Sequence, residues 1–429
     1  MSKHYIKSVS IWGLWAHSEA ISFDLSQQFN FIIGRNGTGK TTVINLIAAA
    51  LLADFDKLDK INFTRIVIQL GAFAGRKKPS IEVLKEQKPN LPYWDITYKI
   101  KLSSSETATF DLDAFAEERA YRGVPARLLR DRHTKEKFLF VQRQLEELVD
   151  VSWLSVYRAS EERDRTDDKR FASAVDQKLA TLSIEIVKYF AKLSQAFAQK
   201  TQEFQQASFL SLTKVEKSTD LQSQIRKLDV SSERAALAAI FELLGVDRND
   251  YEPQLAENSA RFARAKERFE RNDPIPIGEL FLILNAIRAH SLVQLYETLE
   301  ARRSEIFRPR DSFLSVLNSL LAPRKRVYQT ATNELAIESK DGKTLRLEEL
   351  SSGEKQLIII LGQALLQESV GAIYIADEPE LSLHVEWQER ITSSIEQLNP
   401  NAQIIFATHS PDIVGSHADR IIDMERIVQ

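Results

Sequence analysis

A glycine-rich segment near the N-terminus constrains the fold of this 429-residue chain more than any other feature. The segment fits the pattern G-x-x-x-x-G-K-[ST] and reads Gly34-Arg35-Asn36-Gly37-Thr38-Gly39-Lys40-Thr41. It follows the apolar run Phe29–Ile33 and precedes a helix-forming stretch from Thr42 to Leu52. Glycines let the backbone wrap closely, so that N–H groups and the helix N-terminus can face phosphate oxygens. Because strand, loop and helix agree, we predict a phosphate-binding unit of an α/β fold rather than a chance turn.

The residue types in this loop indicate how it would hold a nucleotide. Lys40 supplies a positive charge to the β- and γ-phosphates, and the Thr41 hydroxyl is a ligand for Mg²⁺. The residues predicted to bind the nucleotide in this segment are Gly34, Asn36, Gly37, Thr38, Gly39, Lys40, Thr41 and Thr42.

An acidic strand end near the C-terminus complements this loop. The apolar run Ile373–Ala376 ends in Asp377 and Glu378. Such a strand would deliver Asp377 to the Mg²⁺ ion and leave Glu378 to polarise the attacking water. An acidic pair at a strand end is by itself a common surface feature, but together with the phosphate loop it indicates nucleotide hydrolysis.

A serine–glycine turn stands shortly before the acidic strand. Leu350–Gln356 reads LSSGEKQ and precedes a helix expected from Leu357 to Gln367. The N–H groups and the dipole of a helix N-terminus attract anions, so Ser352 and Gly353 are candidate phosphate contacts. By itself, the turn reads equally well as an N-cap with Glu354 in the first turn.

Glycine and proline are unevenly distributed along the chain, and this predicts a helical middle section. Neither occurs between Pro125 and Gly245. Apolar residues recur there in steps of three and four from Val175 to Leu193, as on one face of a helix or a short coiled coil. For any single stripe of this kind, plain packing is the simpler explanation. Further helices are expected at 253–272 and 277–306.

Both flanks of the helical section are rich in predicted strands. An antiparallel meander is expected over 61–113. The alternating strands and helices after Pro323 indicate the connectivity of an α/β fold. We predict an α/β head with an antiparallel β-lobe and an inserted α-helical, short coiled-coil region. The expected domains are 1–160 for the first part of the head, 161–322 for the helical insert and 323–429 for the rest of the head.

Composition excludes several classes of site. The chain has no cysteine, so disulfides, thiolate metal sites and a cysteine nucleophile are excluded. Its 57 basic and 60 acidic residues give a formal charge of −3, so no global attraction to nucleic acid is expected. No apolar run reaches the ~18 residues of a membrane-spanning helix. No signal-peptide pattern opens the chain, and a cytoplasmic protein is therefore expected.

Together, these motifs resemble the ATP-binding-cassette (ABC) ATPases of the SMC, RecF and OLD branch. The family order also includes the loop Glu380–His384 and the segment Ala407–Pro411. The resemblance implies an ABC-type head that binds ATP and Mg²⁺ and dimerises head to tail. It further implies that Ser352 and Gly353 of one copy contact the γ-phosphate held by Lys40 of another.

The same resemblance implies the remaining roles at the site. His409 would contact the γ-phosphate in its own chain and act with Glu378 and Lys40 in catalysis, and the loop Glu380–His384 would join the two sites. The family's glutamine should follow a strand read here as Trp153–Tyr157, but Arg158 follows it and no glutamine is near. Gln142 and Gln144 lie upstream in an expected helix, so the glutamine role stays unassigned, and Arg158 is a candidate phosphate or interface contact.

Two functions fit this pattern. The first is an ATPase that acts as sensor and scaffold of an anti-phage defence system, resembling PARIS-type ATPases first and Septu-type ATPases next. It would form an even-numbered homo-oligomer, respond to a phage protein and control a separately encoded nuclease, since no nuclease constellation is visible in this chain.

The second function is a RecF-like, DNA-binding repair ATPase. It relies on the segment Arg119–Leu145, which has eight basic residues against two acidic ones. Such a patch could bind DNA or an acidic phage protein, although a charged helix is more often simply a solvated face.

Overall fold

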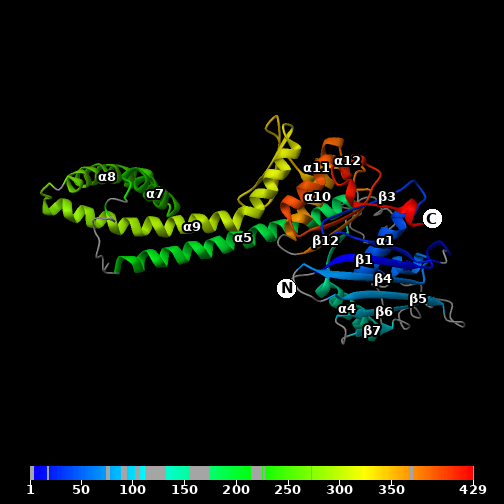
Figure 1. Ribbon diagram of the computed structural model, residues 1–429. Coiled ribbons are helices and arrows are strands. Elements are labelled where there is room, and N and C mark those ends of the chain that lie inside the picture. The colour runs from blue at the N-terminus through cyan, green and yellow to red at the C-terminus, as the bar shows by residue number, and fades with distance from the viewer. Residues whose placement is uncertain are drawn as a thin grey trace. The chain divides into compact units, whose positions relative to one another are not determined.

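The computed structural model describes residues 4–16, 19–73, 78–87, 94–102, 107–111, 132–153, 174–213, 225, 228–271, 273–367 and 371–428. The chain forms two compact units (Figure 1). One unit consists of Met1–Lys188 and Pro309–Gln429, and the other of Tyr189–Arg308. The first unit carries every motif on which the nucleotide-binding hypothesis depends.

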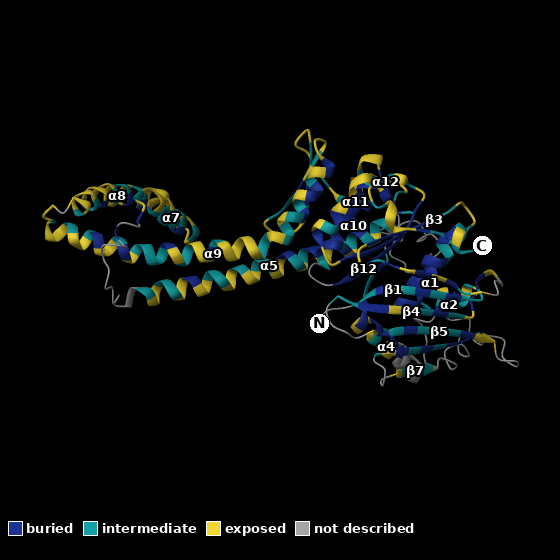
Figure 2. Cartoon of the chain, viewed as in Figure 1, coloured by how far each residue is buried: buried dark blue, intermediate teal, exposed yellow. Residues whose placement is uncertain are grey.

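A five-stranded parallel sheet forms the centre of the first unit. Its order is β14 (Ile421–Asp423), β3 (Phe29–Ile33), β13 (Gln403–Ala407), β12 (Ala372–Asp377) and β8 (Asp150–Trp153). The strands are continuous apolar runs because both faces of the sheet are covered, and β12 is buried along most of its length (Figure 2). Since all strands run in one direction, the segments that follow β3, β12 and β13 meet at one edge, although they lie far apart in the sequence.

A six-stranded antiparallel sheet forms the predicted β-lobe. Its order is β2 (Ile21–Asp24), β1 (His4–Trp12), β4 (Arg65–Ala72), β5 (Ser80–Gln87), β6 (Trp94–Lys101) and β7 (Thr107–Asp111). Buried and less buried residues alternate along β4 and β5, as expected for a sheet with one face on the core. The predicted meander is confirmed.

Helix α1 (Lys40–Leu52) is buried from Val43 to Leu51 because it lies between the two sheets (Figure 1). It packs with apolar residues of both sheets in one core, for example Ile68 and Ile375. The phenol of Tyr98 on β6 donates a hydrogen bond to the carbonyl of Ala50 at its C-terminal end. This burial fixes α1, and with it the loop that precedes it.

The remaining elements of the first unit cover the sheets. Two helices lie in the first half of the chain, α2 (Phe55–Lys60) and α4 (Arg132–Leu148). After residue 321 come a three-stranded antiparallel sheet and four helices, namely β9 (Lys325–Gln329), β10 (Leu335–Ser339), β11 (Thr344–Leu345), α10 (Ser352–Leu366), α11 (Val385–Leu398), α12 (Pro411–Val414) and α13 (Met424–Ile427). The short 3₁₀ segments are Leu14–Ala16, Leu347–Glu349 and Ala418–Arg420.

The helical region is formed by α5 (Ala174–Thr213), α7 (Val230–Leu243), α8 (Arg248–Glu270) and α9 (Ile277–Leu321). In the predicted apolar stripe, Leu182 and Ile186 are buried and lie beside Gly362 of α10, which links the first turns of α5 to the head. Further along, Phe204, Ile240 and Leu299 join α5, α7 and α9 in a separate core. Helix α9 continues past the predicted end at Ile306, through Pro309, to Leu321. The predicted fold class is confirmed, whereas the domain boundaries stay a prediction.

Among the described residues, no helix is both long and apolar enough to span a membrane.

Candidate nucleotide-binding site

The predicted phosphate loop joins β3 to α1. Gly37 and Gly39 have left-handed φ angles of 88° and 85°, which glycine adopts without steric cost. The Lys40 side chain folds back over the loop, and its ammonium donates to the carbonyls of Gly34 and Arg35 at 2.8 and 3.2 Å. Burial lowers the pKa of Lys40, and the nearby carboxylates, of which Glu378 is the strongest, oppose that shift. The loop therefore holds a cation at the start of a buried helix.

Thr41 and Asp377 lie side by side at the carboxyl edge of the parallel sheet. The Thr41 hydroxyl donates a hydrogen bond to Asp377 Oδ1 at 3.0 Å, although the two residues come from opposite ends of the chain. A hydroxyl and a carboxylate are oxygen donors of the kind that Mg²⁺ prefers. These two residues fit the predicted metal site.

Glu378 and His409 follow the neighbouring strands β12 and β13. Their side chains approach to 4.0 Å between Glu378 Oε1 and His409 Nε2, and both are partly exposed. Glu378 has a left-handed φ of 48°, and its N–H donates to the carbonyl of Ala407 at 2.7 Å. Left-handed backbone at a residue other than glycine is strained, and such strain gathers at functional sites.

The carboxylate of Glu380 binds the turn that carries His409. Glu380 Oε1 accepts hydrogen bonds from the Thr408 hydroxyl at 2.7 Å and from the His409 and Ser410 N–H groups at 2.8 and 3.3 Å. From the sequence, Glu380 is predicted only as part of the loop that joins the two sites. No sequence signal indicated this contact, because it depends on the packing of two loops.

The serine–glycine turn is the N-terminus of α10. Ser351 is its N-cap and forms a reciprocal capping box with Glu354, so the N-cap reading is confirmed. Gly353 is buried, and a Cβ atom built on it would lie 2.2 Å from the carbonyl oxygen of Ser382. Gln356 donates to the carbonyl of Pro379 at 2.8 Å. Within one chain, this turn therefore contacts the loop after β12.

Trp15 lies against the phosphate loop and was not among the predicted site residues. A Cβ atom built on Gly39 would lie 1.9 Å from the indole ring, so only glycine allows this contact. The tryptophan is 40% exposed, which is unusual for a large aromatic side chain. In the sequence it is one more apolar residue between two strands, and its exposure becomes visible only in the fold.

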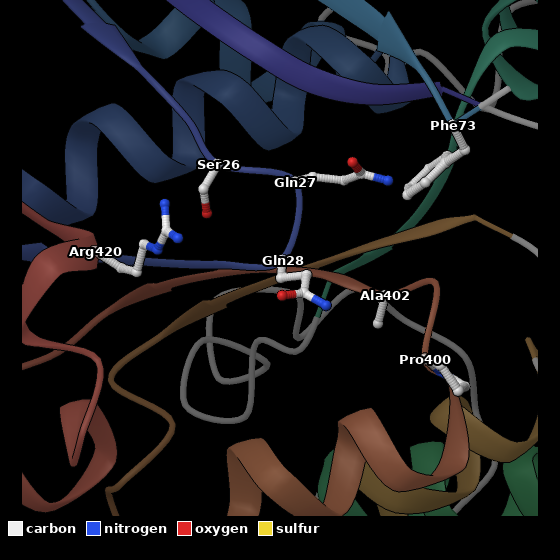
Figure 3. Close-up of a pocket in the computed structure, with 7 residues that line it drawn as sticks. All are labelled: Ser26, Gln27, Gln28, Phe73, Pro400, Ala402 and Arg420. Atoms are coloured by element: carbon white, nitrogen blue, oxygen red, sulfur yellow. The ribbon is translucent and has the colours of Figure 1, made fainter. Parts of the chain in front are cut away.

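A cavity of about 240 Å³ lies elsewhere on the first unit (Figure 3). It is bounded by segments that precede β3, β13 and β14, and it is lined by Ser26, Gln27, Gln28, Phe73, Pro400, Ala402 and Arg420. These segments stand at the amino ends of the parallel strands. Because ligands of open α/β sheets bind at the carboxyl ends, this cavity is not the nucleotide site.

Several predicted features lie outside the described residues. They include Arg158, most of the expected strand Trp153–Tyr157, and the basic segment up to Asp131. Strand β8 begins earlier, at Asp150, and ends at Trp153 as described. Gln142 and Gln144 lie in α4, as expected.

Parts of this chain are similar in sequence to a known family and to known proteins. Residues 182–415 match the family described as "AAA domain, putative AbiEii toxin, Type IV TA system". The chain is 37% identical over 83 residues to the Retron Vc95 probable ATPase of Vibrio cholerae serotype O1 biovar El Tor. This match covers 17% of this chain and 16% of that protein.

The chain is also 35% identical over 101 residues to the Septu protein PtuA of Bacillus thuringiensis. This second match covers 20% of this chain and 25% of that protein. The matches thus span a quarter or less of each relative's length.

Solved structures align over nearly the whole chain at low similarity. An Smc head domain with an extended coiled coil, derived from Pyrococcus furiosus, aligns with 98% of this chain and 93% of its own, at 13% identity and a TM-score of 0.44. The SMC head domain from Thermotoga maritima aligns with 97% and 94%, at 12% identity and a TM-score of 0.36.

Proposed function

This chain belongs to the AbiEii-type AAA-domain family, and from that premise we propose that it binds and hydrolyses ATP with Mg²⁺. One observation carries the proposal. The carboxyl edge of the parallel sheet brings Lys40, the Thr41–Asp377 pair and the Glu378–His409 pair together from distant parts of the sequence. Phosphoryl transfer to water requires a cation, oxygen ligands for the metal and a base, and these residues supply all three.

Each residue has a distinct part in the proposed reaction. The loop N–H groups and Lys40 would bind the β- and γ-phosphates, and Thr41 and Asp377 would hold the metal. When bound, Mg²⁺ supplies positive charge to the phosphate oxygens. Glu378 would orient the attacking water and accept its proton, while His409 would contact the γ-phosphate beside it. Because ATP is the substrate, we place this activity in the cytoplasm.

The proposed active assembly is a dimer in which each nucleotide contacts both copies. Gly353 contacts the loop around Ser382 in its own chain, while Ser352 is exposed. An exposed helix N-terminus can receive the γ-phosphate bound to a second copy. We therefore propose Ser352 and Gly353 as contacts made across the dimer.

The proposed biological role is that of an ATPase in an anti-phage system, which senses a phage product and controls a separately encoded nuclease. Its support is the similarity to a retron ATPase and to a Septu protein, each over part of the chain. Dimer formation would be the signal that such a partner reads.

Replacing Lys40 with alanine tests the proposed nucleotide site. We expect ATP affinity to fall at least about 100-fold, since a buried charge-assisted contact to phosphate is lost. Isothermal titration with ATP and Mg²⁺ measures this, and the exposed Lys60→Ala on α2 is the matched control. Native affinity in the Lys40→Ala variant would remove the phosphate-loop assignment.

Trp15 is proposed to stack on the adenine base of ATP. Stacking of a base on an aromatic ring contributes about 1–3 kcal/mol, so Trp15→Ala should raise the KM for ATP roughly 5-fold to 150-fold with little change in kcat. Trp15→Phe keeps a ring and should stay closer to the native KM. Steady-state kinetics decide the point, and equal KM values for all three proteins would exclude stacking.

A further inference from the structure

The Glu380 carboxylate is arranged as an acceptor for the backbone around His409. One of its oxygens accepts three hydrogen bonds from three consecutive residues, Thr408, His409 and Ser410, two of them from backbone N–H groups. The other oxygen, Oε2, is buried and has no hydrogen-bond partner in the described part of the chain. Hydrogen bonds to a charged acceptor are about twice as strong as neutral ones, so this carboxylate fixes the turn firmly.

The helix that follows does not need this carboxylate. Helix α12 is capped by its own N-cap residue, because the Ser410 hydroxyl accepts from the N–H groups of Asp412 and Ile413. The bonds from Glu380 therefore serve the backbone immediately before the helix. These hydrogen bonds from Glu380 fix the position of His409, whose ring lies beside Glu378.

The loop that carries Glu380 is strained on both sides. Glu378 and Ser382 both have left-handed φ angles, 48° and 76°. Side chains from neighbouring helices hold the loop, since Gln356 donates to the carbonyl of Pro379 and Gln388 donates to that of Leu383. A strained loop persists only where its surroundings determine it, and a change at either anchor can move it.

Gln388 extends the connection to the His409 turn. Its amide oxygen accepts a hydrogen bond from the Ser410 hydroxyl at 2.7 Å, while its nitrogen donates to the loop carbonyl. Glu380 and Gln388 thus join the loop after β12 and the turn after β13 into one hydrogen-bonded unit. The same loop contacts Gly353 of α10, so this unit reaches the turn proposed to meet a second copy.

We infer that Glu380 is a positioning residue for ATP hydrolysis. Its carboxylate holds the His409 backbone so that the imidazole lies against Glu378 and the γ-phosphate. The inference rests on the proposed ATPase function and deepens it. Through the loop that it belongs to, Glu380 also connects His409 to the α10 turn at Gly353. Its effect is on the rate of turnover and not on the binding of ATP.

The test compares Glu380→Ala and Glu380→Gln with the native chain. We expect Glu380→Ala to lower kcat about 10-fold to 100-fold, because small displacements of catalytic groups have effects of that size, with KM within about threefold of native. Glu380→Gln keeps an amide oxygen that can accept from the His409 N–H, and it should lie between the two. Glu389→Ala, at an exposed position on α11, is the matched control and should equal the native chain.

A second measurement reads the hydrogen bond without relying on turnover. Labelling with ¹⁵N-histidine gives one backbone amide signal for each of the seven histidines, and His409→Gln identifies the signal of His409. In Glu380→Ala that signal should move upfield as the bond to the carboxylate is lost. The signals of His4 and His290, which lie elsewhere in the chain, should stay in place.

The outcomes separate this inference from the proposed function. Native kcat in Glu380→Ala, or an unmoved His409 signal, overturns the positioning role while the ATPase proposal stands. A rise in KM that accounts for the whole loss also overturns it, because Glu380 would then act in binding. If the native chain does not hydrolyse ATP, both the inference and the proposed function are wrong.

Discussion

Glu378→Gln should leave ATP binding intact and lower ATP turnover by about 10²–10⁴-fold. Glutamine has the same shape as glutamate but cannot accept a proton from the attacking water. The exchange also keeps the left-handed backbone at this position, because neither side chain is branched at Cβ. Titration with ATP and Mg²⁺ reports binding, and phosphate release reports turnover.

The control for this change is Glu386→Gln, an exposed glutamate on the neighbouring helix α11. It should turn over ATP at the native rate. Turnover of Glu378→Gln within about threefold of native would remove Glu378 from the role of base, since general-base groups contribute far more than that.

The stalled variant also tests the proposed defence role. If hydrolysis ends the dimeric state, Glu378→Gln with ATP and Mg²⁺ should accumulate the assembly that binds the partner. Purification of this variant with its neighbouring genes should then recover a nuclease in fixed stoichiometry. Recovery of DNA without a protein partner would instead favour the RecF-like alternative.

The sequence predicted the centre of this site because its motifs determine the local backbone. The glycines before Lys40 allow one loop shape, and the apolar runs that end at Ile33 and Asp377 are typical of buried parallel strands. Strands of that kind meet at one edge, so the contact of Thr41 with Asp377 followed from the pattern. The resemblance to defence-system ATPases is confirmed by the family and the relatives that match the chain.

Contacts that depend on tertiary packing were not predictable in the same way. Neither the exposure of Trp15 nor its place against Gly39 is visible in sequence, because both depend on how the β1–β2 turn lies on the loop. Glu380 belongs to a predicted loop, but its partners come from a different strand end. The predicted helix over 277–306 is also shorter than α9, which continues through Pro309 to Leu321.

Ser352→Arg should keep ATP binding and abolish the association of two chains that ATP induces. Ser352 is exposed at the first position of α10, so an arginine fits without disturbing the core. In the proposed dimer, the same position faces the γ-phosphate of the second copy, where a long side chain blocks close approach. Analytical ultracentrifugation with and without ATP measures the association, and titration confirms that the isolated chain still binds ATP.

Mixing two inactive variants tests directly whether Lys40 and Ser352 act from different copies. Lys40→Ala lacks the loop side of each site, and Ser352→Arg lacks the side contributed by the partner. A mixed dimer contains one site in which both defects coincide and one site that is intact. Because neither variant associates with itself in ATP, only mixed dimers form, and an equal mixture should regain up to about half of native turnover.

The same mixture distinguishes a shared site from a site within one chain. If Ser352 acted on the nucleotide of its own chain, neither variant could supply what the other lacks, and the mixture would stay inactive. Loss of ATP binding by Ser352→Arg alone would likewise contradict a contact made across the dimer. Recovery of turnover therefore requires that Lys40 and Ser352 act from different copies on one nucleotide.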